Sequence, residues 1–594
     1  MERAEIAEQY TWDLSSIFPS DEAFLAELER AQAYPAQLAA YQGTLQQAAQ
    51  LLSFLRLDDE CDVVIGKLYN YAARKSDEDT RSSLYQDYQA QVETLVVKAV
   101  SACSWFSNEM LGIGAEAMEA LYAAEPGLEL YRRSLEQVFR RAPHVLSPAE
   151  EALLAAAQEL SSQPENTFSM FNDADLRFDD ALDSQGAAHP VTHGSYVPLL
   201  MSQDRELRKS AYSSLYAAYG QFRNTSAAIM ASQMKQLAFF AKARKYGSTL
   251  EAALDANEVP CEVYTQLIAT VRENLGALHK YTGLRKRVLG LGELRFYDLY
   301  VPMVAGMEMR FTYEEACELI LKALEPMGPE YLAVVREGLS QRWVDVYETP
   351  GKRSGAYSAG SYGTHPVILM NFQGELDDVF TLIHEMGHSI HTYLSCQNQP
   401  SRYSDYVIFV AEVASTCNEA LLMRYLLDHA ASTEEKAYLL NHFAEQFRST
   451  LYRQTMFAEF ELKVNELAAT GAGITADALC EMYAQLNRDY FGEDVVVDEQ
   501  IALEWSRIPH FYYRYYVYQY ATGYAAAIAL STRILEEGAE AVADYLRFLS
   551  GGCSKTPLDL LRTAGVDMAT PAPVQAALTL FDATVDELAA LLSA

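Results

Sequence analysis

Two histidines and a glutamate share a stretch of five residues, His384-Glu385-Met386-Gly387-His388. Residues four apart on a helix lie on one face, so both imidazoles can bind one Zn²⁺ at about 2.0–2.1 Å. Glu385 lies about 100° away around the helix. From there its carboxylate can take a proton from a zinc-bound water that attacks a peptide carbonyl. The spacing therefore predicts His384 and His388 as zinc ligands and Glu385 as the general base of a hydrolase.

A catalytic zinc site needs a third protein ligand and an open fourth position. His391 shares the face of the two histidines, but it lies about 10 Å beyond His384 along a straight helix and cannot reach the same ion. Glu412 interrupts the apolar run VIFVAEVA, where an unpaired carboxylate would be costly. We therefore predict Glu412 as the third ligand. Glu419, two turns later, either orients a ligating histidine or is a helix-surface glutamate.

A dense aromatic run, PHFYYRYYVYQYATG, follows about a hundred residues later and begins with Pro509 and His510. Its six tyrosines need many hydrogen-bond partners, although any single one of them is more often a core residue. A peptidase must stabilise a developing oxyanion, and tyrosine or histidine donors can do so. We expect such donors within this run.

The elements that position these residues are predicted to be mainly helices, because 19 prolines and 30 glycines are few for 594 residues. The segment LDDVFTLIHEMGHSIHTYL is typical of a helix, with Asp377 and Asp378 in its first turn. The apolar run 366–372 follows the glycine-rich RSGAYSAGSYG and has the length of a buried strand. This extended segment either offers an edge to a peptide substrate or is an ordinary turn before a core strand. From Gln373 to its end the chain again has a helical pattern.

The coarse organisation predicts two regions. Residues 1–200 form an N-terminal helical region with a short β excursion near 169–200, and residues 201–594 form the catalytic region. No low-complexity linker separates them, so we expect both to pack as one body.

Charge and composition indicate which classes of binding partner and which cellular compartment to expect. The formal net charge of −35 disfavours nucleic acid and anionic membranes. No apolar run approaches the ~20 residues of a membrane span, and the charged start MERAEIAEQYTWDL does not resemble a signal peptide. Eight scattered cysteines, without a CxxC pair, favour reduced thiols in the cytoplasm.

Three segments, HEMGHSIH, FVAEVASTCNE and IPHFYYRYYVYQYATG, resemble oligoendopeptidase F within the thimet-oligopeptidase family. The resemblance covers nearly the whole chain, including YTWDLSSIF and FSMFNDADLRF. It implies a mainly α fold, in which a large helical body encloses a deep channel for short peptides and a short β segment lies near the zinc helix. It further implies an endopeptidase with one zinc ion per chain. By resemblance, the metal ligands are His384, His388 and Glu412, and the catalytic residues are Glu385, His510, Tyr515 and Tyr518.

Two other functions remain open at this point. One is a peptidyl-dipeptidase that resembles angiotensin-converting enzyme, which also carries HEMGH; the FVAEVAST segment and the absence of a secretory signal favour the endopeptidase. The other is a non-catalytic protein that holds zinc and binds peptides. Glu385 argues against it, because a structural zinc site has no use for that residue. The products distinguish the two enzymes: internal cuts in blocked peptides, or dipeptides released from the C-terminus.

Overall fold

The computed structural model describes residues 2–304, 306 and 309–593. The chain forms two compact units, and each is built from three separate segments. Unit 1 comprises Met1–Pro148, Met309–Leu422 and Leu530–Gly565, and unit 2 comprises Ala149–Glu308, Met423–Ala529 and Val566–Ala594. Each unit contains segments from both sides of residue 200, so the predicted division into 1–200 and 201–594 stays a prediction. The mainly α fold is confirmed, because helices dominate both units and the strands are short.

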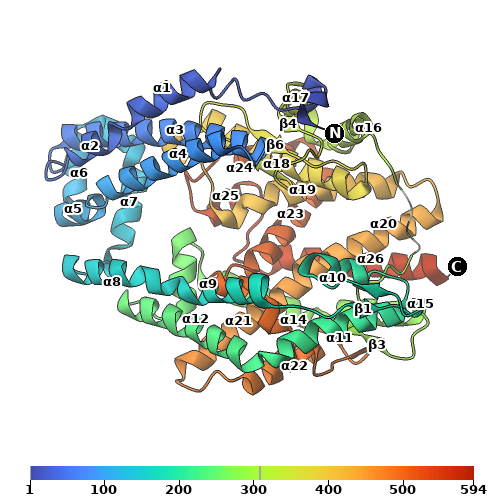
Figure 1. Ribbon diagram of the computed structural model, residues 1–594. Coiled ribbons are helices and arrows are strands. Elements are labelled where there is room, and N and C mark those ends of the chain that lie inside the picture. Colours follow the sequence, from blue (N-terminus) through green and yellow to red (C-terminus); the bar gives the residue numbers. More distant parts are fainter. Residues whose placement is uncertain (1, 305, 307–308, 594) are drawn as a thin grey trace. The chain divides into compact units, whose positions relative to one another are not determined.

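Unit 1 begins with a run of helices that bury one apolar core. Helices α3 and α4 run side by side (Figure 1), and the side chains between them include Tyr71, Val92 and Leu95. Two later residues, Val367 and Leu369, complete this core. The helices of this unit are α1 (Asp21–Ala31), α2 (Tyr34–Ala39), α3 (Ala48–Glu78), α4 (Ser83–Ala102), α5 (Phe106–Ile113), α6 (Ala115–Ala124), α7 (Arg132–Arg140), α16 (Tyr313–Ala323), α17 (Gly328–Ser340), α18 (Leu376–Asn398), α24 (Ala539–Leu549) and α25 (Pro557–Thr563).

A three-stranded sheet in unit 1 lies against helix α18. Its strands are β4 (Val344–Asp345), β5 (Tyr357–Ala359) and β6 (Val367–Leu369), in the order β4-β6-β5. The central strand β6 is completely buried and pairs parallel with β4 and antiparallel with β5. The predicted buried strand within 366–372 is thus confirmed, and β5 forms an edge of the sheet.

Helix α18 carries the HExxH segment, as predicted. Its N-terminus is closed by a capping box in which the Asp378 carboxylate accepts the backbone N–H of Glu375 at 2.9 Å. Asp377 and Asp378 in the first turn match the positive end of the helix dipole. The following long helix, α19 (Ile408–Asp428), carries Glu412 and Glu419; the boundary between the units falls within it, as it does within α23 (Tyr518–Glu537).

Unit 2 is also helical. The antiparallel pair β1 (Ala181–Leu182) and β2 (Ala188–His189) lies where a short β excursion was expected, and β3 (Leu294–Arg295) pairs parallel with β7 (Val495–Val496). The helices are α8 (Pro148–Ser161), α9 (Gln163–Ser169), α10 (His193–Leu200), α11 (Arg205–Gln221), α12 (Arg223–Ala243), α13 (Thr249–Leu254), α14 (Cys261–Glu273), α15 (Leu275–Val288), α20 (Thr433–Gln446), α21 (Arg453–Ala469), α22 (Ala476–Phe491) and α26 (Ala572–Ser593).

The expectation of continuous helix from Gln373 onward is wrong between α22 and α23. Strand β7 is followed by two 3₁₀ segments, η11 (Ile501–Arg507) and η12 (Pro509–Tyr512), so the aromatic run enters a helix only at Tyr518. Arg514 and Tyr515 have φ angles of 56° and 60°, which a regular right-handed helix excludes. Across residues 2–304, 306 and 309–593, we find no helix with both the length and the apolar character of a membrane span.

Candidate metal centre

His384 and His388 face each other from consecutive turns of α18. Their Nε2 atoms are 3.1 Å apart. The helix explains this convergence, because residues i and i+4 share a face. Both side chains are about three-quarters or more covered, with 26% and 18% of their surfaces exposed.

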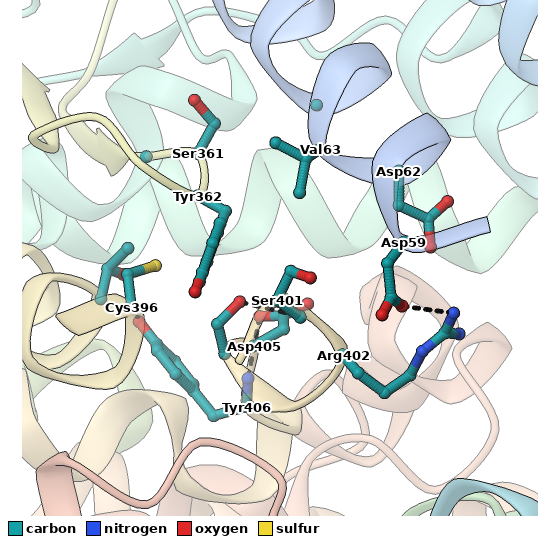
Figure 2. A pocket seen from close by; sticks show the side chains of 14 residues that line it. Asp59, Asp62, Val63, Ser361, Tyr362, Cys396, Ser401, Arg402, Asp405 and Tyr406 are labelled. Atoms are coloured by element: carbon teal, nitrogen blue, oxygen red, sulfur yellow. Dashed lines mark hydrogen bonds and ion pairs between the residues drawn. The ribbon is translucent and has the colours of Figure 1, made fainter. Parts of the chain in front are cut away.

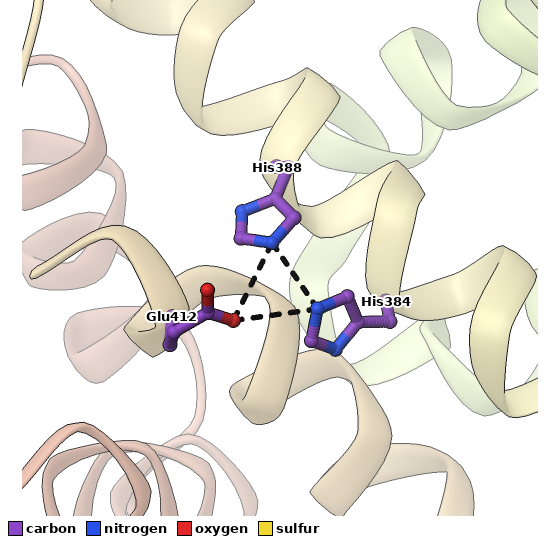
Figure 3. Close-up of side chains that lie close together, drawn as sticks. All are labelled: His384, His388 and Glu412. Carbon is purple, nitrogen blue, oxygen red and sulfur yellow. Dashed lines mark hydrogen bonds and ion pairs between the residues drawn. The ribbon is translucent and has the colours of Figure 1, made fainter. Parts of the chain in front are cut away.

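Glu412 of α19 completes a group of three ligand atoms (Figure 3). Its Oε2 lies 3.3 Å from His384 Nε2 and 3.5 Å from His388 Nε2. Ligands held at about 2.0–2.1 Å from a tetrahedral Zn²⁺ are separated from one another by about 3.3–3.4 Å. The three atoms therefore have the spacing that one zinc ion requires, and within the described residues they form the one His/Cys/Asp/Glu group with metal-ligand geometry.

Helices α18 and α19 can approach so closely because of Gly387. A Cβ atom at this position would lie 2.6 Å from Ser415 Cα and 2.8 Å from the carbonyl oxygen of Ala414, both backbone atoms of α19. Only a residue without a side chain fits against the neighbouring backbone. Gly387 thus sets the separation across which Glu412 meets the two histidines.

Glu419 contacts Nδ1 of His384, the ring nitrogen that faces away from Glu412. Its Oε1 is hydrogen-bonded to His384 Nδ1, which leaves Nε2 directed at Glu412. Burial lowers the pKa of His384, but the hydrogen bonds to Glu412 and Glu419 outweigh burial and raise this pKa to about 10. The two carboxylates therefore favour positive charge at this point, and a metal cation would supply it. Glu419 is thus in contact with a histidine, with 20% of its side chain exposed, and its role in orienting a ligand stays a prediction.

Glu385 lies beside the three ligand atoms and beneath strand β5. It is 7% exposed, and burial raises its pKa, an effect that the two neighbouring imidazoles oppose. The backbone of Ser358 hydrogen-bonds to its carboxylate, and the Ser358 hydroxyl lies 2.8 Å from that of Ser389 on α18. Strand β5 is therefore fixed against α18 at the level of Glu385, and its outer edge is the edge of the sheet.

His391 does not take part in this group. It is 1% exposed, and its ring stacks on Tyr406 with the centroids 3.7 Å apart. The structure agrees with the sequence argument that excluded it as a ligand.

A cavity of about 400 Å³ opens one turn beyond His388 along α18 (Figure 2). Thr392 and Cys396 line it from α18, and Gly360 and Tyr362 line it directly after β5. Acidic residues dominate its charged lining, and its one arginine is engaged by aspartates.

His510 and the tyrosines belong to unit 2. Tyr513, Tyr516 and Tyr520 contact the His510 ring, and the Tyr520 hydroxyl lies 3.4 Å from His510 Nε2. Tyr515 and Tyr518, which the resemblance selects, are 2% and 1% exposed. Their catalytic roles, like that of His510, stay predictions.

Tyr515 is anchored at both ends. Its hydroxyl is 2.8 Å from that of Thr249, and its backbone N–H donates to Glu461 at 2.7 Å. Glu461 is 1% exposed, and burial raises its pKa to about 8. These contacts hold the backbone in its left-handed conformation at Arg514 and Tyr515.

Comparison with known proteins decides the family. The sequence pattern described as peptidase family M3 matches residues 199–580, and the pattern described as oligopeptidase F matches residues 109–178. The chain belongs to peptidase family M3. Oligopeptidase PepF of Bacillus subtilis is 46% identical over 592 residues, which is 100% of this chain and 88% of the relative.

Two solved structures agree with this membership of family M3. Oligoendopeptidase F from Enterococcus faecium is 36% identical with a TM-score of 0.76, and the match covers 96% of this chain and 99% of that one. A peptidase from Chlamydophila abortus is 37% identical in sequence, and its crystal structure matches with a TM-score of 0.94 over 99% of both chains. The chain is therefore an oligoendopeptidase F-type metalloendopeptidase, as the sequence resemblance predicted.

Two residues that support these segments were not predicted from the sequence. One is Gly387, which sets the contact of α18 with α19. Glu461 lies 54 residues before the Tyr515 backbone that it binds. In the sequence, Glu461 stands in FAEFELKVNE between Glu459 and Lys463, so nothing there distinguishes it from an ordinary helix-surface glutamate.

Proposed function

We propose that this metalloendopeptidase cleaves internal bonds of short, unstructured peptides, with one zinc ion held by His384, His388 and Glu412. The observation that carries the proposal is the convergence of three ligand atoms at 3.1–3.5 Å with Glu385 beside them. The name of the Bacillus subtilis relative, an oligopeptidase, supports short peptides as the substrate class.

Zinc bound here would act as a Lewis acid towards water and the scissile carbonyl. Glu385 would take the proton of the attacking water and return it to the leaving nitrogen. Its burial suits this role, because a raised pKa brings the carboxylate closer to the pH at which it must exchange protons. Glu419 would hold His384 in the tautomer that presents Nε2 to the metal.

The substrate backbone would pair with the outer edge of β5. Main-chain hydrogen bonds to an edge strand hold an extended peptide without reading its side chains. The contact of Ser358 with Glu385 would then align the bound peptide with the general base. The donors of the His510 segment, with Tyr515 and Tyr518 as the predicted ones, would complete the stabilisation of the oxyanion.

The reducing cytoplasm is the proposed location. No disulfide joins any of the eight cysteines, all of which lie in the part of the chain that the structure describes. This agrees with the expectation from their scattered positions.

The test combines Glu385→Gln with a library of peptides blocked at both ends. The variant should keep about one zinc per chain and lose about 10²–10⁴ in kcat, because it removes the proton acceptor and no ligand. The wild-type enzyme should cut blocked peptides internally, and a chelator should stop it. Release of C-terminal dipeptides alone would support the peptidyl-dipeptidase instead. Near-normal turnover of the variant would overturn the mechanism.

A further inference from the structure

Unit 2 buries a cluster of four arginines, one of which, Arg507, comes three residues before His510. Arg285 on α15 and Arg448 on η10 (Phe447–Tyr452) are 1% and 3% exposed. The side chains of Arg453, at the start of α21, and Arg507, at the end of η11, expose 13% and 20% of their surfaces. Arginine is rarely buried unless its charge is compensated.

The carboxylates in contact with these arginines compensate half of the charge. Glu445 pairs with Arg285 and Arg448, and Glu504 pairs with Arg453 and Arg507. Four guanidinium groups thus meet two carboxylates, which leaves a formal excess of two positive charges.

The next carboxylate outward does not remove this excess. Asp298 is completely buried and is itself bound by Arg205 and Arg208. Adding these three residues to the cluster would increase the positive excess. An uncompensated charge in the interior is costly, so the fold favours a further negative charge here.

A small cavity lies within this cluster. The polar residues that line it are Arg448, Arg453, Arg507, the carboxylate Glu504 and the tyrosines Tyr196, Tyr212, Tyr216 and Tyr300. Its volume of about 10 Å³ leaves room for roughly one water-sized particle. This size excludes phosphate, a carboxylic acid or a peptide group.

Most polar groups of the lining are hydrogen-bond donors, and its one carboxylate, Glu504, is already paired with Arg453 and Arg507. Tyr196 is 4% exposed, and we find no hydrogen bond from its hydroxyl to any described residue. The Tyr216 hydroxyl accepts from Arg507 Nε at 3.4 Å, so its own proton can be donated elsewhere. Arg507 also lies over the Tyr196 ring, 5.6 Å from its centroid.

We propose that this cavity binds a single chloride ion, which is monatomic and only slightly larger than a water molecule. A water molecule would satisfy the Tyr196 hydroxyl, but it would leave both excess charges uncompensated. Chloride would accept from the hydroxyls and the guanidinium groups at once and would halve the excess. No residue that lines this cavity belongs to the group of His384, His388 and Glu412.

Bromide replaces chloride in the direct test, because its anomalous scattering locates it in a crystal. Crystals of the full chain soaked in sodium bromide should show an anomalous peak among Arg448, Arg453 and Arg507. In solution, enzyme dialysed free of chloride should gain melting temperature in a saturable way when sodium chloride replaces sodium gluconate at constant ionic strength.

Two variants make the test specific. Tyr196→Phe removes one donor and keeps the ring, so half-saturation should need about ten times more chloride, the loss expected for one hydrogen bond to a charged group. Tyr219→Phe, on α11 like Tyr216, loses a hydroxyl that bonds to Asn172 outside the cavity and should respond to chloride like the wild type. An empty or water-filled cavity in bromide-soaked crystals would overturn the proposal, as would identical melting curves in chloride and gluconate.

Discussion

Replacement of Gly387 by alanine tests whether the contact of α18 with α19 sets the metal geometry. The added Cβ would lie 2.6 Å from Ser415 Cα, about 0.8 Å short of the 3.4 Å at which ordinary contact begins. The obstacle is backbone, so a side-chain rotation cannot relieve it. The helices must separate by a large part of this distance, at a cost of about 1–3 kcal/mol for an overpacked contact.

The same movement would displace Glu412 from the two histidines. Zinc sites tolerate deviations of only about 0.2 Å from ideal ligand distances. We therefore expect Gly387→Ala to weaken zinc binding at least tenfold, comparable to the loss of a supporting contact to a ligand. Competition with a fluorescent chelator measures this affinity, and the melting temperature of the metal-free protein measures the packing cost.

The matched control is Gly66→Ala in the middle of α3, where an added Cβ meets nothing within 4 Å. It should raise stability by about 0.5–1 kcal/mol, because alanine loses less backbone entropy in a helix. If Gly387→Ala binds zinc as tightly as the wild type, then the approach of the two helices does not determine the metal geometry.

Three further changes test other parts of the site. Glu419→Ala should weaken zinc binding by about 10–100-fold, since it releases His384 from its partner; unchanged affinity in the chelator assay would make Glu419 a bystander. Tyr518→Phe should lower kcat about 10²–10³-fold with little change in KM if its hydroxyl reaches the oxyanion, and a change in melting temperature alone would assign it to packing. The pKa of Glu461 is raised to about 8, so the folded protein holds a proton that the unfolded chain has lost. Stability should therefore fall between about pH 4.5 and 8, and Glu461→Gln should remove this fall; parallel melting curves of both proteins against pH would contradict it.

The metal centre could be predicted from the sequence because local rules govern most of it. Any helix places His384 and His388 on one face, because they are four residues apart. Glu412 could be recognised as a lone carboxylate among apolar residues. What the sequence could not supply was the closeness of the two helices. That depends on the backbone of Ala414 and Ser415 meeting Gly387, and no pattern within one helix encodes such a contact.

The aromatic run shows where periodicity fails. A regular helix would place tyrosines three or four residues apart on one face, but η12 and the left-handed pair Arg514–Tyr515 replace the helix before Tyr518. Spacing then no longer tells which hydroxyls share a face. Tyr513 and Tyr516 contact the His510 ring, although the resemblance had selected others.

The arginine cluster was invisible for a related reason. In the sequence, arginines and glutamates on amphipathic helices are typical of a solvated surface. Arg285, Arg448 and Arg507 come from segments more than 200 residues apart in their widest separation, and only the packing of α15, η10 and η11 brings them together. Long-range convergence of this kind has no local signature.

The three-segment construction of unit 1 determines when this unit can complete its folding during synthesis. The N-terminal core is incomplete until Val367 and Leu369 have been added, and the unit as a whole is incomplete until Leu530–Gly565 has been added. A chain emerging from the ribosome cannot finish this unit until residue 565 has been translated. We infer that α18 and the first half of α19 remain without their complete surroundings until this segment has been translated, so that the metal-binding residues reach their final geometry only afterwards.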